Sequence, residues 1–138
     1  MPKKIIINEN GGPEVLKFET TTLDKLGVDE VLIEHKAIGL NFIDTYHRSG
    51  LYPLDLPSKI GGEGSGIIKK IGSKIKDFSI GDRVAYAGAP LGSYSSERNY
   101  PTKNLVKIPA EVSFEIAATL MTKGLTSYYL LFKTYPVS

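Results

Sequence analysis

Four glycines at positions 61, 62, 64 and 66 constrain the fold of this chain more than any other feature. A dinucleotide-binding loop needs Gly-x-Gly-x-x-Gly between a strand and a helix, and these glycines do not have that spacing. The residues that follow, 67–71, are rich in β-branched side chains, which predict a strand rather than a helix. A Walker loop would end in Gly-Lys-Ser/Thr, whereas Ile67 follows Gly66. The cluster is therefore not predicted to bind phosphate.

Glycines inside strands mark bulges, tight corners or places where another group approaches the backbone. Glu63 stands among them, so a carboxylate is placed beside bare backbone. Physical reasoning alone favours a strand corner with a surface glutamate. The alternative is a cofactor or substrate face that Cβ atoms would obstruct.

Short apolar, β-branched runs separated by turn residues cover most of the chain. The predicted strands are 5–7, 15–20, 31–38, 64–71, 83–87, 93–100 and 104–108. Regular short strands at this spacing predict a small barrel or sandwich.

Two regions predict helices instead. Asn41 can cap a short helix that ends near Ser49. Ser113 can cap a longer one, which Gly124 is expected to interrupt, and a second apolar helix over 125–132 is expected to end near Pro136. The chain is thus predicted to be mainly β with helices, with a barrel over 1–112 and a helical connection over 113–138.

Composition excludes several classes of function. A length of 138 residues fits one domain, and a net charge of +2 gives no reason to expect nucleic acid as a partner. There are no cysteines, so disulfides, zinc ribbons and thiol nucleophiles are excluded within the chain. No apolar run approaches the about 18 residues of a membrane span, and we expect a cytoplasmic protein.

A metal site is not expected either. The only histidines are His35, in a predicted strand, and His47, on the short predicted helix. We expect His35 to be a packed strand residue and His47 to be solvated. Three ligands of suitable type cannot be assembled from this set.

Five segments resemble the quinone oxidoreductases of the medium-chain dehydrogenase/reductase superfamily, the ζ-crystallin-like group. They are 41–46, 50–53, 61–66, 81–86 and 123–126, in the order and spacing of that family. The resemblance implies a GroES-like β-barrel, like the N-terminal domain of alcohol dehydrogenases, and a longer protein whose Rossmann domain is absent from this chain. Zinc-dependent relatives have a histidine immediately before the glutamate that matches Glu63. Gly62 stands there, which implies a zinc-independent enzyme.

The resemblance also implies roles for particular residues. The reaction is hydride transfer from NADPH to a quinone or a conjugated carbonyl. Asn41 and Tyr46 match positions beside the nicotinamide and the acceptor, Tyr52 matches the acceptor pocket, and Thr126 and Lys123 match the cofactor side. The structural alternatives stay open: Asn41 as a helix cap, Tyr46 as a core aromatic, Tyr52 as an exposed loop aromatic, Thr126 bonded to its own helix and Lys123 solvated.

Two other functional hypotheses remain. The chain is either a non-catalytic GroES-like fragment without independent cofactor binding, or part of an enone or enoyl reductase. Because the pyrophosphate-binding helix is missing, the chain alone is expected to be inactive and not to bind NADPH. The full-length relatives are expected to be homodimers that pair through the missing domain. Here the apolar side chains of Leu125, Tyr128, Tyr129 and Phe132 are expected to be exposed and to promote self-association.

Overall fold

The computed structural model describes residues 1–135, which form two antiparallel sheets accompanied by helices α1 and α2. The strands are β1 Lys3–Ile7, β2 Lys17–Thr20, β3 Glu30–Gly39, β4 Ser58–Lys59, β5 Glu63–Ile71, β6 Arg83–Ala87, β7 Glu97–Pro101 and β8 Leu105–Lys107. The helical elements are α1 Phe42–Ser49, α2 Phe114–Tyr128, two 3-10 helices at Pro13–Val15 and Thr102–Asn104, and a π-helical segment at Tyr129–Thr134. The predicted class, mainly β with helices, is confirmed.

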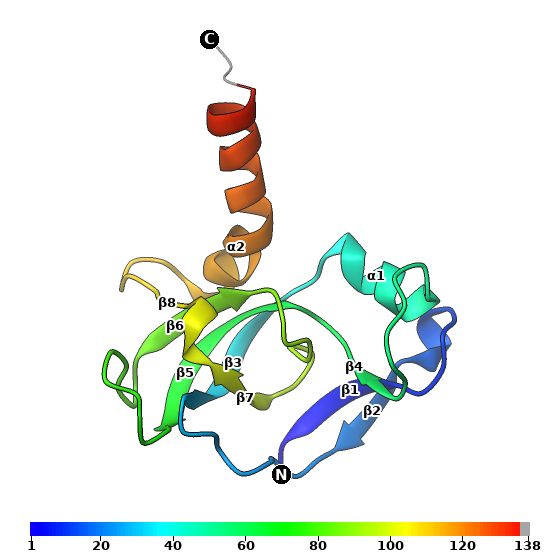
Figure 1. Cartoon of the computed structure of the whole chain (residues 1–138), viewed down its shortest axis with the longest axis horizontal. Coiled ribbons are helices and arrows are strands. Elements are labelled where there is room, and N and C mark those ends of the chain that lie inside the picture. The colour runs from blue at the N-terminus through cyan, green and yellow to red at the C-terminus, as the bar shows by residue number, and fades with distance from the viewer. Residues whose placement is uncertain (136–138) are drawn as a thin grey trace.

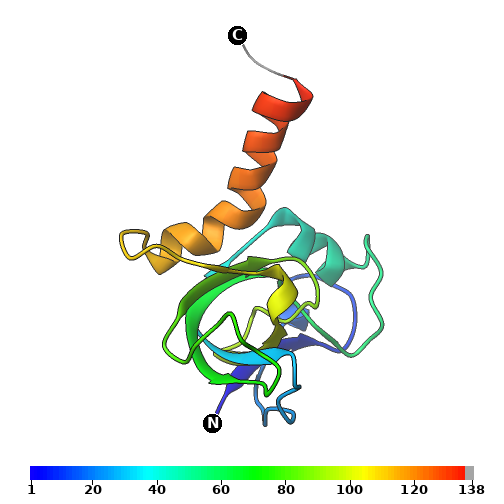
Figure 2. The same ribbon diagram turned by 60° about the vertical axis from the view of Figure 1, so that its left-hand side comes forward.

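The larger sheet has the order β7-β3-β5-β6-β8 and the smaller one the order β2-β1-β4. The larger sheet curves strongly around its interior, as Figure 2 shows. Strand β3 contributes to this curvature through register irregularities against β5 at Leu32/Ile33 and at His35/Ala37. Bulges of this kind bend a strand and increase its twist, and so help a sheet to close on itself.

The core lies inside this curved sheet. Ile33 and Ile68 face each other across β3 and β5, and both are fully buried. Tyr86 of β6 stacks on Tyr100 of β7 with ring centroids 4.0 Å apart. Burial of such side chains stabilises the fold by about 1.5–3 kcal/mol each. The barrel core therefore comes from the β-branched and aromatic residues that identified the strands in the sequence.

Helix α2 leaves the barrel and projects away from it, while α1 lies to its side, above the small sheet of β1, β2 and β4 (Figure 1). Only the start of α2 packs closely, with Ala117 and Ala118 buried against the sheets. Its cap is as predicted, because Ser113 Oγ accepts a hydrogen bond from the backbone N–H of Ile116 at 3.2 Å. Neither α-helix of the described residues is long and apolar enough to cross a membrane.

The expected break at Gly124 is wrong. Helix α2 passes through Gly124 and continues into the π-helical segment, so the predicted helix over 125–132 is part of one continuous helical stretch. A glycine inside a helix costs only about 1 kcal/mol, which the surrounding helical hydrogen bonds offset. Pro136, the expected end of that helix, lies outside the described residues.

Some strand boundaries also differ. The strand expected over 93–100 begins only at Glu97, because Ser95 N–H bonds to Ser93 O within a tight local turn. Val15 belongs to a 3-10 helix rather than to β2, and Asn104 to another that precedes β8. The two-residue strand β4 was not predicted, since so short a segment carries no periodic signal.

Candidate functional site

A cleft of about 690 Å³ lies between α1, the end of β6 and the middle of α2. Its lining includes Asn41, His47, Gly62, Ala87, Met121 and Thr126. A cavity that is mostly apolar, with a few convergent polar groups, is typical of small-molecule sites. The cleft therefore brings together two of the predicted site residues, Asn41 at the start of α1 and Thr126 on α2.

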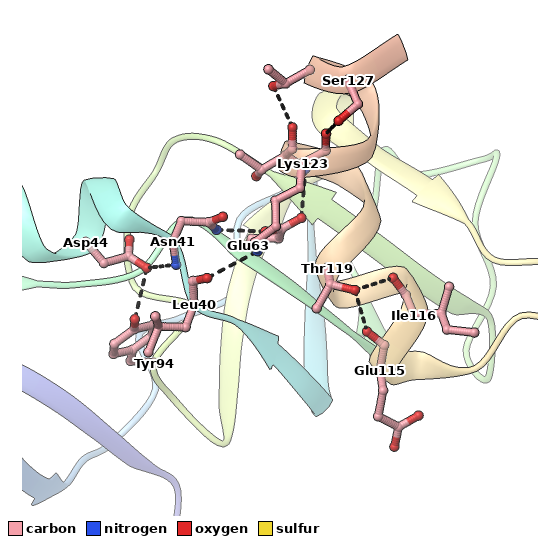
Figure 3. A network of polar contacts seen from close by, with 12 residues as sticks. Leu40, Asn41, Asp44, Glu63, Tyr94, Glu115, Ile116, Thr119, Lys123 and Ser127 are labelled. Atoms are coloured by element: carbon pink, nitrogen blue, oxygen red, sulfur yellow. Dashed lines mark hydrogen bonds and ion pairs between the residues drawn. The ribbon is translucent and has the colours of Figure 1, made fainter.

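Glu63 lies beside this cleft and is fully buried, so the expected surface glutamate is wrong. Its Oε2 accepts a hydrogen bond from Asn41 Nδ2 at 2.7 Å, and its Oε1 accepts one from the backbone N–H of Thr122 at 2.7 Å. The ammonium of Lys123 lies 3.8 Å from Oε2. Figure 3 shows Asn41 and Lys123 converging on the Glu63 carboxylate. Hydrogen bonds and a counter-charge together compensate for the cost of burying the charge.

Asn41 is held at the N-terminus of α1. It forms a capping box with Asp44, whose Oδ2 accepts a hydrogen bond from the backbone N–H of Asn41 at 2.9 Å. The hydroxyl of Tyr94 donates to the same Asp44 oxygen at 2.9 Å. Burial, reinforced by the Asp44 carboxylate, raises the pKa of Tyr94 above its usual range. Asn41 therefore serves both as a helix cap and as part of the cleft wall.

On the opposite wall, Thr126 and Lys123 lie one turn apart on α2. Thr126 Oγ1 donates to the backbone carbonyl of Thr122 at 2.6 Å, so the hydroxyl bonds to its own helix. Lys123 Nζ donates to the carbonyl of Leu40 at 3.2 Å, besides its approach to Glu63. Lys123 therefore ties α2 to the chain just before α1, and it is not among the residues that line the cleft.

Tyr46 and Tyr52 form an aromatic pair next to the cleft. Their rings meet edge to face with centroids 5.4 Å apart, and the backbone N–H of Tyr52 bonds to the carbonyl of Tyr46 at 3.2 Å. Phe42 extends the cluster, 6.1 Å from Tyr46. Neither tyrosine is among the cleft-lining residues. The structure thus brings the two predicted tyrosines together but does not place them in the cleft with Asn41, and their roles stay predictions.

The two histidines have different surroundings. His35 Nδ1 lies 2.6 Å from the carbonyl of Ser95 and Nε2 lies 2.7 Å from the hydroxyl of Tyr86, which confirms a packed strand residue. His47 is partly buried, lines the cleft and lies against Tyr52, so its expected solvation is wrong. Helix α1 turns this face inward because Asn41, Asp44 and His47 are three residues apart. Within residues 1–135 no three His, Cys, Asp or Glu side chains are grouped so as to hold a metal ion.

Gly62 leaves space in the cleft. The three atoms nearest to a Cβ built on it would all lie at ordinary contact distances: Leu91 Cδ2 at 3.7 Å and two Gly88 backbone atoms at 3.9 and 4.0 Å. By contrast, a Cβ on Gly39 would collide with the carbonyl oxygen of Ala118. Gly39 is thus required by close packing against α2, whereas Gly62 opens the cleft without being required sterically.

Sequence reasoning missed three residues of this region. Glu63, Asp44 and His47 were not chosen as site residues, although two of them line the cleft and the third holds Asn41. A glutamate flanked by glycines inside a predicted strand was the available signal for Glu63, since such a position has close backbone on every side.

A curved antiparallel barrel that carries a ligand-sized cleft beside a projecting helix defines the class of this domain. Residues 27–110 match the alcohol dehydrogenase GroES-like domain family, and the chain belongs to that family.

Several known proteins are similar to the chain. It is 49% identical over 136 residues to a quinone oxidoreductase of Pseudomonas aeruginosa, a match that covers 98% of this chain and 42% of that protein. The crystal structure of Escherichia coli quinone oxidoreductase complexed with NADPH superposes with a TM-score of 0.94 at 49% identity, covering 99% of this chain and 42% of that one. A 2-haloacrylate reductase of Burkholderia sp. is 38% identical over 138 residues, covering 96% and 41%. The chain thus spans less than half the length of these relatives.

Proposed function

We propose that this chain is the barrel portion of an NADPH-dependent quinone reductase, an enzyme that transfers a hydride from a nicotinamide to a quinone or a related conjugated carbonyl. The observation that carries the proposal is the cleft in which Asn41, held by a buried glutamate, faces Thr126 across bare backbone at Gly62. The 49% identity to quinone oxidoreductases and the NADPH in the similar Escherichia coli structure support it.

The cleft suits the nicotinamide end of the cofactor. Its volume of about 690 Å³ falls within the range of about 300–1,000 Å³ that small-molecule sites have. Asn41 and Thr126 would hold the ring from the two walls, and Lys123 would keep the walls together. The described residues contain no Gly-x-Gly-x-x-Gly turn that opens a helix, so the pyrophosphate would be held by a part of the protein outside them.

NADPH, when bound, supplies the hydride, and the acceptor takes up that hydride and a proton. Without a metal, the negative charge that develops on the acceptor oxygen needs hydrogen-bond donors. We assign this task to Tyr46 and Tyr52, whose hydroxyls make no hydrogen bond within residues 1–135 and whose rings lie beside the cleft. Asn41 and Thr126 would orient the ring, and the apolar lining would exclude water.

A chimera tests the proposal. Residues 1–138 would replace the matching N-terminal portion of the Escherichia coli enzyme, and NADPH oxidation would be followed with 1,4-benzoquinone as the acceptor. We expect quinone-dependent turnover that falls when Tyr46→Phe and Tyr52→Phe are combined. A folded chimera without turnover would refute the proposal. The 138-residue chain alone, titrated with NADPH up to millimolar concentration, is expected to show no binding.

A conjugated alkene is the second candidate for the acceptor. The 38% identity to a 2-haloacrylate reductase favours it, because that name describes reduction of a carbon–carbon double bond beside a carboxyl group. The same chimera, assayed with 2-chloroacrylate, 2-cyclohexenone and 1,4-benzoquinone at equal concentrations, separates the two. We expect the quinone to be the fastest acceptor.

We also propose that the whole protein works in the cytoplasm as a homodimer, and that residues 113–138 connect the barrel over 1–112 to a cofactor-binding domain. The absence of cysteine from the chain agrees with a reducing compartment. Size-exclusion chromatography of the chimera and of the chain alone tests the assembly.

A further inference from the structure

The buried carboxylate of Glu63 joins three parts of the structure that are distant in the sequence. Glu63 belongs to β5, Asn41 precedes α1 by one residue, and Thr122 lies inside α2. The two hydrogen bonds span 22 and 59 residues of sequence, and both are 2.7 Å long. A fully buried carboxylate with such short bonds to both neighbours is a rigid connection between the two walls of the cleft.

The bond to Thr122 is unusual because of its place in the helix. In the middle of a regular α-helix, the backbone N–H bonds to the carbonyl four residues earlier, which here belongs to Ala118. Here Glu63 Oε1 accepts a hydrogen bond from this N–H, and Gly39 packs closely against the Ala118 carbonyl. A side chain that inserts into the hydrogen-bond ladder bends a helix. Figure 2 shows α2 changing direction between its first turns and its projecting part, which carries Thr126.

The bond to Asn41 fixes the direction of the amide. A carboxylate can only accept, so the Asn41 nitrogen must face Glu63. The amide nitrogen is thus committed to Glu63, and the side-chain oxygen is left as the group that can accept from a donor in the cleft, whose lining includes Asn41. The carboxamide N–H of a nicotinamide is such a donor.

We propose that Glu63 is a positioning residue for the hydride transfer proposed above: it fixes the Asn41 amide and the Thr126 segment of α2 relative to each other across the cleft. The inference rests on the proposed function for its kinetic consequences. Its structural content, a defined amide direction imposed by a buried carboxylate, can be measured on the chain without any ligand.

A pair of isosteric substitutions tests this arrangement. Glu63→Gln keeps an acceptor for Thr122 but places an NH₂ group against the NH₂ group of Asn41, so one of the two bonds is lost or the amide turns round. Asn41→Asp places two carboxylates against each other. In the double variant N41D/E63Q, the new glutamine donates to the new aspartate and still accepts from Thr122, and the aspartate can still cap α1.

In the chimera, we expect E63Q to lower kcat by about tenfold or more while the KM for NADPH changes by less than about threefold, because a misplaced ring slows transfer more than binding. The double variant is expected to recover kcat to within about threefold of the parent. Glu9→Gln, on an exposed loop, is the matched control and should change neither constant. Equal kcat in E63Q and the parent, or no recovery in the double variant, would overturn the proposal.

The 138-residue chain supplies a second, ligand-free measurement. In its ¹⁵N NMR spectrum, the side-chain NH₂ of Asn41 is expected to be protected from hydrogen exchange and displaced from the other asparagines. E63Q should remove both properties. If that variant does not fold, the protection of the Asn41 amide in the parent chain still tests the proposal. An unprotected Asn41 amide in the parent overturns the proposal even if the chimera is active. If the chimera lacks activity but the amide is protected, the proposed function fails and the structural connection stands.

Discussion

Acidification should destabilise the fold through one histidine. The carbonyl of Ser95 can only accept, so His35 Nδ1 carries a proton and donates to it, and Nε2 of the neutral ring accepts from the hydroxyl of Tyr86. A second proton would have to enter at Nε2, facing a hydroxyl oxygen that already accepts from Arg98 at 3.3 Å. Burial, with the Arg98 charge as a smaller cause, lowers the pKa of His35 to about 4 despite the opposing hydrogen bond to Ser95.

The direction of the pH effect on stability follows from proton binding in the folded and unfolded chain. Below its usual pKa of 6.5 the histidine of the unfolded chain binds a proton, whereas the folded chain does not until about pH 4. The contribution of His35 to the free energy of unfolding is therefore fully present above pH 6.5. It is lost as the pH falls toward 4, with a slope of about 1.4 kcal/mol per pH unit. The whole shift corresponds to about 3 kcal/mol, of which about 2 kcal/mol is lost by pH 5.

Urea unfolding followed by circular dichroism at several values between pH 5 and pH 7 measures this slope. Carboxyl groups with lowered pKa values, such as those of Glu34 and Asp82, stabilise the fold above their usual pKa. Their contribution is lost only at more acidic pH. The interval from about pH 5 to 6.5 therefore isolates the histidine. We expect the urea midpoint to fall by about 1 M over it.

Two substitutions complete the test. His35→Gln keeps a donor for Ser95 and an acceptor for Tyr86 but does not titrate, so the slope between pH 5 and 6.5 should disappear. His47→Gln leaves His35 in place, and the slope should persist. If the His35→Gln variant keeps the slope of the parent chain, the burial argument is refuted.

Three further predictions concern packing. Gly39→Ala should destabilise the chain by about 1–3 kcal/mol because its Cβ would collide with the Ala118 carbonyl. Gly62→Ala should change the free energy of unfolding by less than about 0.5 kcal/mol. Urea unfolding compares the two variants. Ser113→Ala removes the cap of α2 and should cost about 1 kcal/mol in the same assay. Phe132, 62% exposed, belongs to an apolar surface on the projecting helix. The chain should therefore bind a hydrophobic dye and self-associate in analytical ultracentrifugation, and Phe132→Glu should weaken both. A parent chain that is monomeric and binds no dye would contradict this.

The apolar surface was anticipated from the sequence and is found. Its exposed side chains are Leu125, Tyr128, Tyr129 and Phe132. Their exposure agrees with the expectation that this stretch lacks a packing partner in the chain, and self-association itself stays a prediction.

The amino-acid sequence alone predicted much of the architecture, because the signals involved are local. β-branched runs and turn residues located most strands, and Asn41 and Ser113 marked the starts of both helices. The glycine spacing excluded a phosphate loop, and the absence of cysteine excluded thiolate ligands for a metal. The strand, cap and glycine signals each depend on residues within a few positions of one another.

The tertiary structure decided the features that depend on distant partners. Glu63 is polar and was expected at the surface, yet hydrogen-bond donors 22 and 59 residues away make its burial possible. Likewise, His47 turns inward because α1 packs beside the cleft. Local propensity amounts to about 1 kcal/mol per residue, whereas leaving a buried charge without its partners costs about 3–5 kcal/mol. The site therefore follows from which distant groups the fold brings together, and the strands from the residues themselves.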